Sequence, residues 1–196
     1  MKKSAKLLSL FTIVLLLYGS LQSQTGLIPG GSIINDIKKV IEDYPSGFAN
    51  ISGVLIVQNP QSAEYECNFK VSNAEKSTIT IYSSNKKRIC SWQALMLSTD
   101  DFIDAKKKYK LIYGQLINQA VNFNGSNNFQ LKGSYQEPKE ENKFTVSVLT
   151  LQPDKENTIK LRIEVSLQYE MMEWKLRVLV YDKEKEDNER GSLIDN

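Results

Sequence analysis

Carboxylates, lysines and two cysteines are the side chains in this sequence that could do chemistry, because the chain contains no histidine. The missing imidazole excludes Ser-His-Asp and Cys-His nucleophile systems, histidine-ligated zinc or copper, and a histidine pH switch. No GxSxG, GxGxxG or GxxxxGK[ST] pattern occurs. We therefore expect no catalytic residues, no metal site, no cofactor and a protein that is not an enzyme.

Two dense charge clusters have simpler interpretations than a ligand site. The carboxylates of DDFID (100–104) resemble a metal-binding set, but acidic residues are favoured in the first turn of any helix. The lysines of KKKYK (106–110) follow directly and fit a solvated helix face better than a phosphate or lipid-headgroup site. Both clusters therefore predict a helix rather than a site.

The N-terminus has the pattern of a secretory signal peptide. Three lysines precede the apolar run of residues 7–17, which is too short to span a bilayer. Small residues follow, so we expect residues 1–23 to be removed, with Ser20 as the alternative cleavage position. The pattern predicts an exported protein, periplasmic or secreted, without an integral membrane segment after signal cleavage.

Export also changes the charge of the chain. The full sequence has a net charge of +2, and residues 1–23 hold three lysines and no acidic residue, so the mature chain is left at −1. The basic isoelectric point therefore belongs to the leader. It provides no argument for nucleic acid, and we expect no nucleic-acid partner.

The element pattern is one helix and four strands, followed by a second helix and four strands. The first helix starts at Ser32 and stops before Pro45, and the second is expected to run from about Ser98 to Phe123. The charged tail 183–196 lacks apolar periodicity and is expected to be disordered. The expected strands cover residues 54–58, 64–72, 77–83, 88–97, 129–135, 143–152, 158–168 and 174–182.

Landmark residues recur about 80 residues later in the chain, which is the signature of an internal duplication. The pairs are Tyr44 with Phe123, Gly53 with Gly133, Pro60 with Pro138, Ile81 with Leu161, and Trp92 with Trp174. We therefore expect an α+β fold of two tandem helix-plus-four-stranded antiparallel sheet units, 24–98 and 99–182, with the helices packed on one face of the sheet or sheets. In element order alone this resembles the β-lactamase inhibitor proteins. That resemblance implies a tandem architecture and transfers no functional residue.

Alternation along the strands assigns the two tryptophans to the core. Trp92 shares a strand face with Cys90 and Ala94, and Trp174 shares one with Leu176 and other aliphatic residues. Apolar neighbours favour a packing role over a ligand platform. We expect each tryptophan to lie under the helix of its own half.

The cysteines leave two alternatives open. Cys67 and Cys90 both point inward by alternation, and two cysteines in an exported chain indicate a disulfide. In a simple meander, however, a third strand would lie between them. Strands separated by another are about 9–10 Å apart, whereas a disulfide needs Cα atoms within about 7 Å. A bond between Cys67 and Cys90 and two buried thiols remain the alternatives.

The outward face of the expected sheet is the candidate binding surface. Tyrosine and arginine on a rigid exposed sheet are residue types that anchor protein interfaces. We therefore expect a non-enzymatic binding module of a cell envelope that presents this face to a protein or peptide partner. The alternative is a carrier of a small apolar ligand held between helices and sheet, and a carboxylate-based hydrolase ranks third. The candidate binding residues are Tyr82, Leu149, Arg162, Arg177 and Tyr181.

Overall fold

The computed structural model describes residues 33–83, 89–123, 125–153 and 161–182. The expected signal peptide, the Ser32 helix cap and the charged tail lie outside the described residues. The described chain contains α2 (Ile33–Asp43) and α3 (Phe102–Leu116), short 3₁₀ turns at Tyr44–Ser46 and Glu140–Asn142, and nine strands. The strands are β1 (Ser52–Asn59), β2 (Ser62–Cys67), β3 (Lys76–Tyr82), β4 (Ile89–Thr99), β5 (Ala120–Phe123), β6 (Ser126–Gly133), β7 (Phe144–Gln152), β8 (Leu161–Glu170) and β9 (Glu173–Asp182).

The strands form one antiparallel sheet in the order β1-β2-β3-β4-β9-β8-β7-β6-β5. The expectation of two tandem helix-plus-four-strand units is therefore wrong, although the mixed α+β content is confirmed. The two halves are joined because β4 pairs with β9 from Ser91 opposite Tyr181 to Thr99 opposite Trp174. This pairing satisfies the backbone groups of both strands, so neither half ends in a free edge at that point. The resemblance to a tandem inhibitor arrangement loses its basis with this result.

The second half also contains a fifth strand where the sequence indicated helix. The helix α3 ends at Leu116, because Asn118 adopts a left-handed backbone with φ of 63° and donates its N–H to the carbonyl of Leu131. Beyond it, Val121 and Phe123 are buried and Ala120 and Asn122 are exposed, which is the two-residue period of β5.

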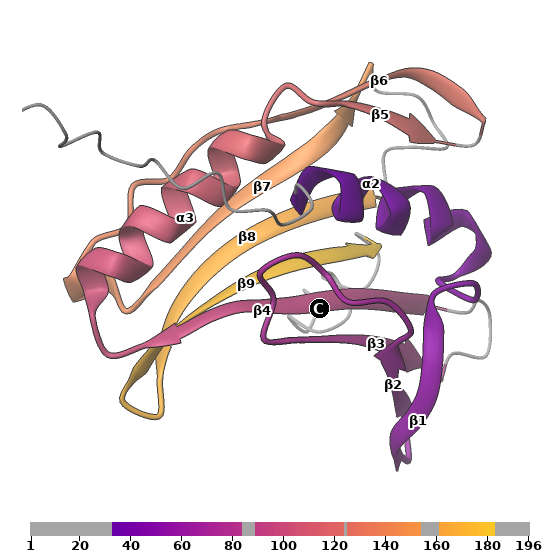
Figure 1. The fold of residues 1–196 in the computed structure, drawn as a ribbon, viewed down its shortest axis with the longest axis horizontal. Coiled ribbons are helices and arrows are strands. Elements are labelled where there is room, and N and C mark those ends of the chain that lie inside the picture. The colour runs from indigo at the N-terminus through magenta and orange to yellow at the C-terminus, as the bar shows by residue number, and fades with distance from the viewer. Residues whose placement is uncertain (1–32, 84–88, 124, 154–160, 183–196) are drawn as a thin grey trace, which may run out of the picture.

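Both helices lie on the same side of the curved sheet, and the core fills the space between them and the strands (Figure 1). The buried face of α2 is apolar, because Ile33, Ile37, Val40 and Ile41 recur at helical spacing. The helix α3 buries Ala105, Tyr109, Ile112, Tyr113 and Leu116, and Phe102 at its start is half-buried.

The two tryptophans are core residues, as the sequence indicated. Trp92 is fully buried and lies in cross-strand register with Ile79 on one side and Val180 on the other. Trp174 packs against Phe102 in the first turn of α3, with ring centroids 4.9 Å apart. Trp174 therefore lies against the helix of its own half, and neither indole ring forms an exposed platform for a ligand.

Candidate binding surfaces

Four of the five candidate residues lie on the sheet face opposite the helices. Tyr82, Arg162 and Arg177 are half-buried there, and Tyr181 is only 6% exposed. Arg162 lies opposite Tyr181 in the β8–β9 pairing, so these two residues are neighbours. The Tyr181 hydroxyl donates a hydrogen bond to Glu164 Oε2 at 3.2 Å. The structure therefore places Arg162 and Tyr181 side by side, but the Tyr181 hydroxyl is already hydrogen-bonded within the protein.

Leu149 does not belong to this face, and its assignment as an outward residue is wrong. Leu149 is fully buried under the helices, as are Ser147 and Leu151 on the same face of β7. Val146 and Val148 lie on the opposite face of β7 and are half-buried. Because β7 has apolar residues on both of its faces, alternation in its sequence could not indicate which face lies under the helices.

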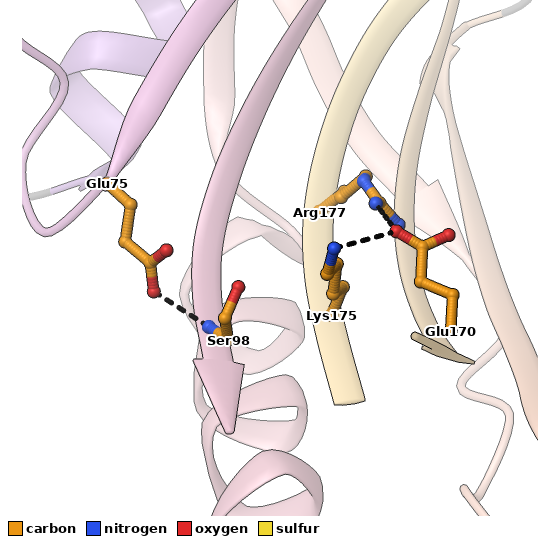
Figure 2. A network of polar contacts seen from close by, with 5 residues as sticks. All are labelled: Glu75, Ser98, Glu170, Lys175 and Arg177. Carbon is orange, nitrogen blue, oxygen red and sulfur yellow. Dashed lines mark hydrogen bonds and ion pairs between the residues drawn. The ribbon is translucent and has the colours of Figure 1, made fainter. Parts of the chain in front are cut away.

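Arg177 is held by an ion pair. Its Nη2 contacts Glu170 Oε1, and Lys175 Nζ lies 3.5 Å from the same oxygen (Figure 2). Burial raises the pKa of Glu170, but the hydrogen bond and charge of Arg177 and the charge of Lys175 outweigh it, so the pKa lies below its usual value. Arg177 therefore stabilises the β8–β9 hairpin. Figure 2 also shows Glu75 Oε1 accepting the Ser98 N–H at 2.7 Å, which ties the start of β3 to the end of β4.

A run of four exposed apolar side chains lies instead on β1, at one end of the sheet. Val54, Leu55, Ile56 and Val57 are 66%, 51%, 41% and 40% exposed. They are consecutive, so both faces of the strand expose large apolar side chains. Figure 1 shows the β1–β2 hairpin extending away from the helices. Because large apolar side chains are usually buried, this exposed run makes β1 the candidate binding surface.

Irregular pairing explains why all four side chains are exposed. The β1–β2 register shifts between Ser52 and Leu55 and again between Leu55 and Val57, which inserts extra residues into β1. Such bulges bend a strand and increase its twist. Within the described residues β1 is the terminal strand of the sheet, so its outer backbone edge has no neighbouring strand.

Sequence reasoning predicted this strand but not the exposure of its apolar side chains. Residues 54–58 were expected to form a strand, and no face was assigned to them. The available signal was the run VLIV itself, because four consecutive apolar residues cannot all lie on one face of a strand. In a central strand such a run is buried on both faces, whereas at an edge it is exposed.

A surface groove lies beside the end of β2 and the start of β3. It has a volume of about 330 Å³ and is lined by residues 66–71 and 74–77. Glu66, Lys70, Glu75 and Lys76 contribute charge to its wall. Neither tryptophan lines it, so it is not the dry cavity beneath Trp92 or Trp174 that an apolar-ligand carrier requires.

Cys67 and Cys90 are not joined by a disulfide. The meander of β2, β3 and β4 separates them, since Cys90 lies opposite Ile81 of β3, whereas Glu66, the residue before Cys67, lies opposite Thr78. They are therefore two strands apart and also displaced along the strands, well beyond the reach of a disulfide. Of the two alternatives from the sequence, two separate thiols are observed.

The charged segments have structural roles. Asp101 caps α3, its Oδ1 accepting the N–H groups of Ile103 at 2.7 Å and Asp104 at 3.2 Å. Lys106 forms an ion pair with Glu137 at 2.6 Å. Among the described residues no group of three or more acidic or cysteine side chains is placed to hold a metal ion.

No described helix is long and apolar enough to cross a membrane. Comparison of the chain with family models, with curated proteins and with solved structures gives no match, so the surfaces of the protein itself must support any functional conclusion.

Proposed function

We propose that the protein is an exported, non-enzymatic binding module that holds an extended segment of a protein by strand addition at β1. The observation that supports this proposal most directly is the row Val54 to Val57, at least 40% exposed at every position, on a terminal strand. An edge strand offers backbone N–H and C=O groups that an added strand can pair with. The exposed side chains then supply the apolar contact.

The binding surface in this proposal differs from the flat sheet face first expected. On that face Tyr181 is nearly buried and Arg177 is paired with Glu170, so moving either onto a partner would break contacts within the protein. On β1 the apolar side chains are in water, and covering them is favourable at about 25 cal/mol per Å². Binding at β1 therefore does not require an ion pair like that of Arg177 to be broken.

A carrier of a small apolar ligand is the less supported alternative. The groove beside β2 and β3 is lined by Glu66, Lys70, Glu75 and Lys76, and these charges disfavour an apolar guest. Export is proposed from the lysines and apolar run of residues 1–17, which match a signal peptide.

Hydrogen exchange on the full chain tests the proposal directly. The probe is a panel of synthetic eight-residue peptides rich in valine, isoleucine and threonine, with proline-containing versions as inactive partners. We expect a binding peptide to slow exchange of the amides of residues 53–58, because strand addition protects the outer edge.

Matched lysine substitutions provide the control. Val54→Lys places a charge on the binding edge, whereas Ile103→Lys places one at an equally exposed apolar position on α3. Strand addition predicts that Val54→Lys abolishes peptide protection and that Ile103→Lys preserves it. If every peptide leaves the amides of residues 53–58 unprotected, the proposed function is wrong.

A further inference from the structure

The turn between β8 and β9 presents two large apolar side chains to solvent at the tip of a hairpin. Met171 and Met172 are 88% and 80% exposed, the highest values among the large hydrophobic residues that the structure describes. In Figure 1 the orange-yellow hairpin that carries them projects from the sheet, away from the β1–β2 hairpin. We propose that this turn inserts shallowly into the surface of a phospholipid bilayer and holds the protein there. The inference goes beyond strand addition at β1 and uses a different surface.

The stability of the turn does not explain its two methionines. Both residues have positive φ, 53° and 68°, in a two-residue turn that favours Asn-Gly. Met171 and Met172 therefore strain the backbone and also leave two apolar side chains in water. Strained positions of this kind are found where a residue serves binding rather than stability. An apolar environment outside the protein would offset the cost of exposing both side chains.

Aromatic side chains continue the exposed surface behind the turn. Tyr169 lies two residues before Met171 and is 36% exposed, and its ring lies 5.1 Å from that of Trp174. Phe144 begins the neighbouring strand β7, lies opposite Gln168, and is 49% exposed. Aromatic rings with one polar end are enriched at the boundary between lipid and water. The exposed surface therefore changes from aliphatic to aromatic with distance from the turn.

Cationic side chains lie farther from the tip. Lys143 Nζ lies 4.4 Å from the centre of the Tyr169 ring, and Lys175 comes three residues after Met172. With a rise of about 3.3 Å per residue, Tyr169 lies about 7 Å and Lys175 about 10 Å behind the turn. Segments that bind a membrane surface reach about 5–10 Å into the boundary between headgroups and acyl chains. The order of methionine, tyrosine and lysine matches the order of acyl chains, interface and phosphates, which favours a bilayer over a protein partner.

The charges near the turn indicate which bilayer fits. Residues 139–143 and 170–177 each contain two basic and two acidic residues, so the attraction to anionic lipid is weak. Glu170 is paired with Arg177, whereas Glu173 is exposed and directly follows the turn. Glu173 therefore limits insertion to the methionine side chains. We expect a zwitterionic phosphatidylcholine bilayer to be sufficient for binding.

Methyl NMR of the full chain with phosphatidylcholine bicelles tests the inference at the turn itself. The sequence has four methionines, so selective methyl labelling reports on Met171 and Met172, with the buried Met96 as an internal control. Spin-labelled phosphatidylcholine in the bicelles should broaden the Met171 and Met172 signals beyond detection and leave the Met96 signal visible. The apolar run of residues 7–17 complicates any measurement of total binding, and this local readout avoids that problem.

Lysine substitutions provide the matched variants. Met171→Lys places a charge in the inserted turn, so the Met172 signal should persist with spin-labelled lipid. Leu111→Lys, at a 53% exposed position on α3, should leave the broadening of both turn methyls unchanged. Phe144→Lys keeps the turn sequence intact and serves as a second disrupting variant. Circular dichroism checks that each variant is folded.

Several outcomes would overturn the inference. These are turn methyls that are broadened no more than Met96, broadening of Met172 that Met171→Lys leaves unchanged, and broadening that requires anionic lipid. Sedimentation equilibrium without lipid measures the competing occupant. Self-association that Met171→Lys abolishes, without broadening by spin-labelled lipid, would show that a second copy covers the turn and would also overturn the inference. None of these results bears on strand addition, which the exchange of residues 53–58 tests separately.

Discussion

Trp92 and Val180 lie opposite each other in the β4–β9 pairing, although they belong to different halves of the chain. Both side chains are buried on the helix-covered face. This contact lies in the middle of the nine-stranded order, with β1 to β3 on one side and β5 to β8 on the other. The core of the protein is therefore shared between the two halves.

Trp92 should be the most sensitive single position in this core. Trp92→Ala removes a fully buried side chain and should lower the free energy of unfolding by about 3–5 kcal/mol. Trp92→Phe should cost less than half of that, because the indole Nε1 has no hydrogen-bond partner within the described residues and its loss breaks no bond. Urea unfolding monitored by circular dichroism measures both values. Equal losses for the two variants would show that Nε1 is bonded in solution.

Substitutions in the β8–β9 turn should increase the stability of the protein. Met171 and Met172 are 88% and 80% exposed and have φ of 53° and 68°, the left-handed conformation of a type I′ turn. Such turns favour Asn-Gly, because a side chain at positive φ is strained. Changing both residues, Met171→Asn with Met172→Gly, should raise the free energy of unfolding by about 1 kcal/mol.

Alanine at both turn positions is the control. Met171→Ala with Met172→Ala removes the exposed methionine side chains and keeps a Cβ at positive φ. Thermal unfolding should therefore show no comparable gain for the alanine pair. Equal stabilisation by both pairs would assign the effect to side-chain exposure and contradict the backbone explanation.

Tyr109 should make stability fall in strong alkali. Burial raises the pKa of its phenol from 10.0 to about 12, with the hydrogen bond to Ser147 Oγ acting in the opposite direction. The unfolded chain therefore ionises first. The stabilisation is complete below pH 10 and decreases as the pH rises toward 12, by about 1.36 kcal/mol per pH unit.

Tyr109→Phe tests this linkage. It should cost about 1 kcal/mol at neutral pH through the lost hydrogen bond, and it should reduce the slope of stability against pH between 10 and 12 by one proton. Urea titrations at several pH values give the slope. An unchanged slope would mean that Tyr109 ionises equally in the folded and unfolded chains.

The two thiols should react at different rates. Cys67 is partly exposed and Cys90 is buried, and they share no disulfide. A water-soluble maleimide should therefore modify Cys67 in the native protein and reach Cys90 only after unfolding, as mass spectrometry can follow. A reductant should leave the melting temperature unchanged. A lower melting temperature with reductant would indicate a bond between the cysteines in solution.

Helices and strands could be predicted where the spacing of apolar residues fits only one of them. They could not be predicted where the same apolar residues fit both a helix and a strand, or both faces of a strand. The face of α2 and the burial of Trp92 and Trp174 follow from local spacing. The apolar residues 116, 120 and 123 have the spacing of a helix, but Val121 and Phe123 also have the spacing of a strand. In the structure the Asn118 N–H bonds to the Leu131 carbonyl, the helix ends, and residues 120–123 form β5. Leu149 was assigned to the wrong face because β7 has apolar residues on both faces.

The sequence by itself determined the absence of histidine chemistry, the mixed α+β content, and which face of each strongly amphipathic element is apolar, because these depend on residues close together in the chain. Only the tertiary structure decided that Ser91–Thr99 pairs with Trp174–Tyr181 to join the halves. It also decided that the run Val54 to Val57 lies at an edge. Strand order is set by pairing between distant segments, so the same apolar run can be the core of a sheet or its exposed boundary.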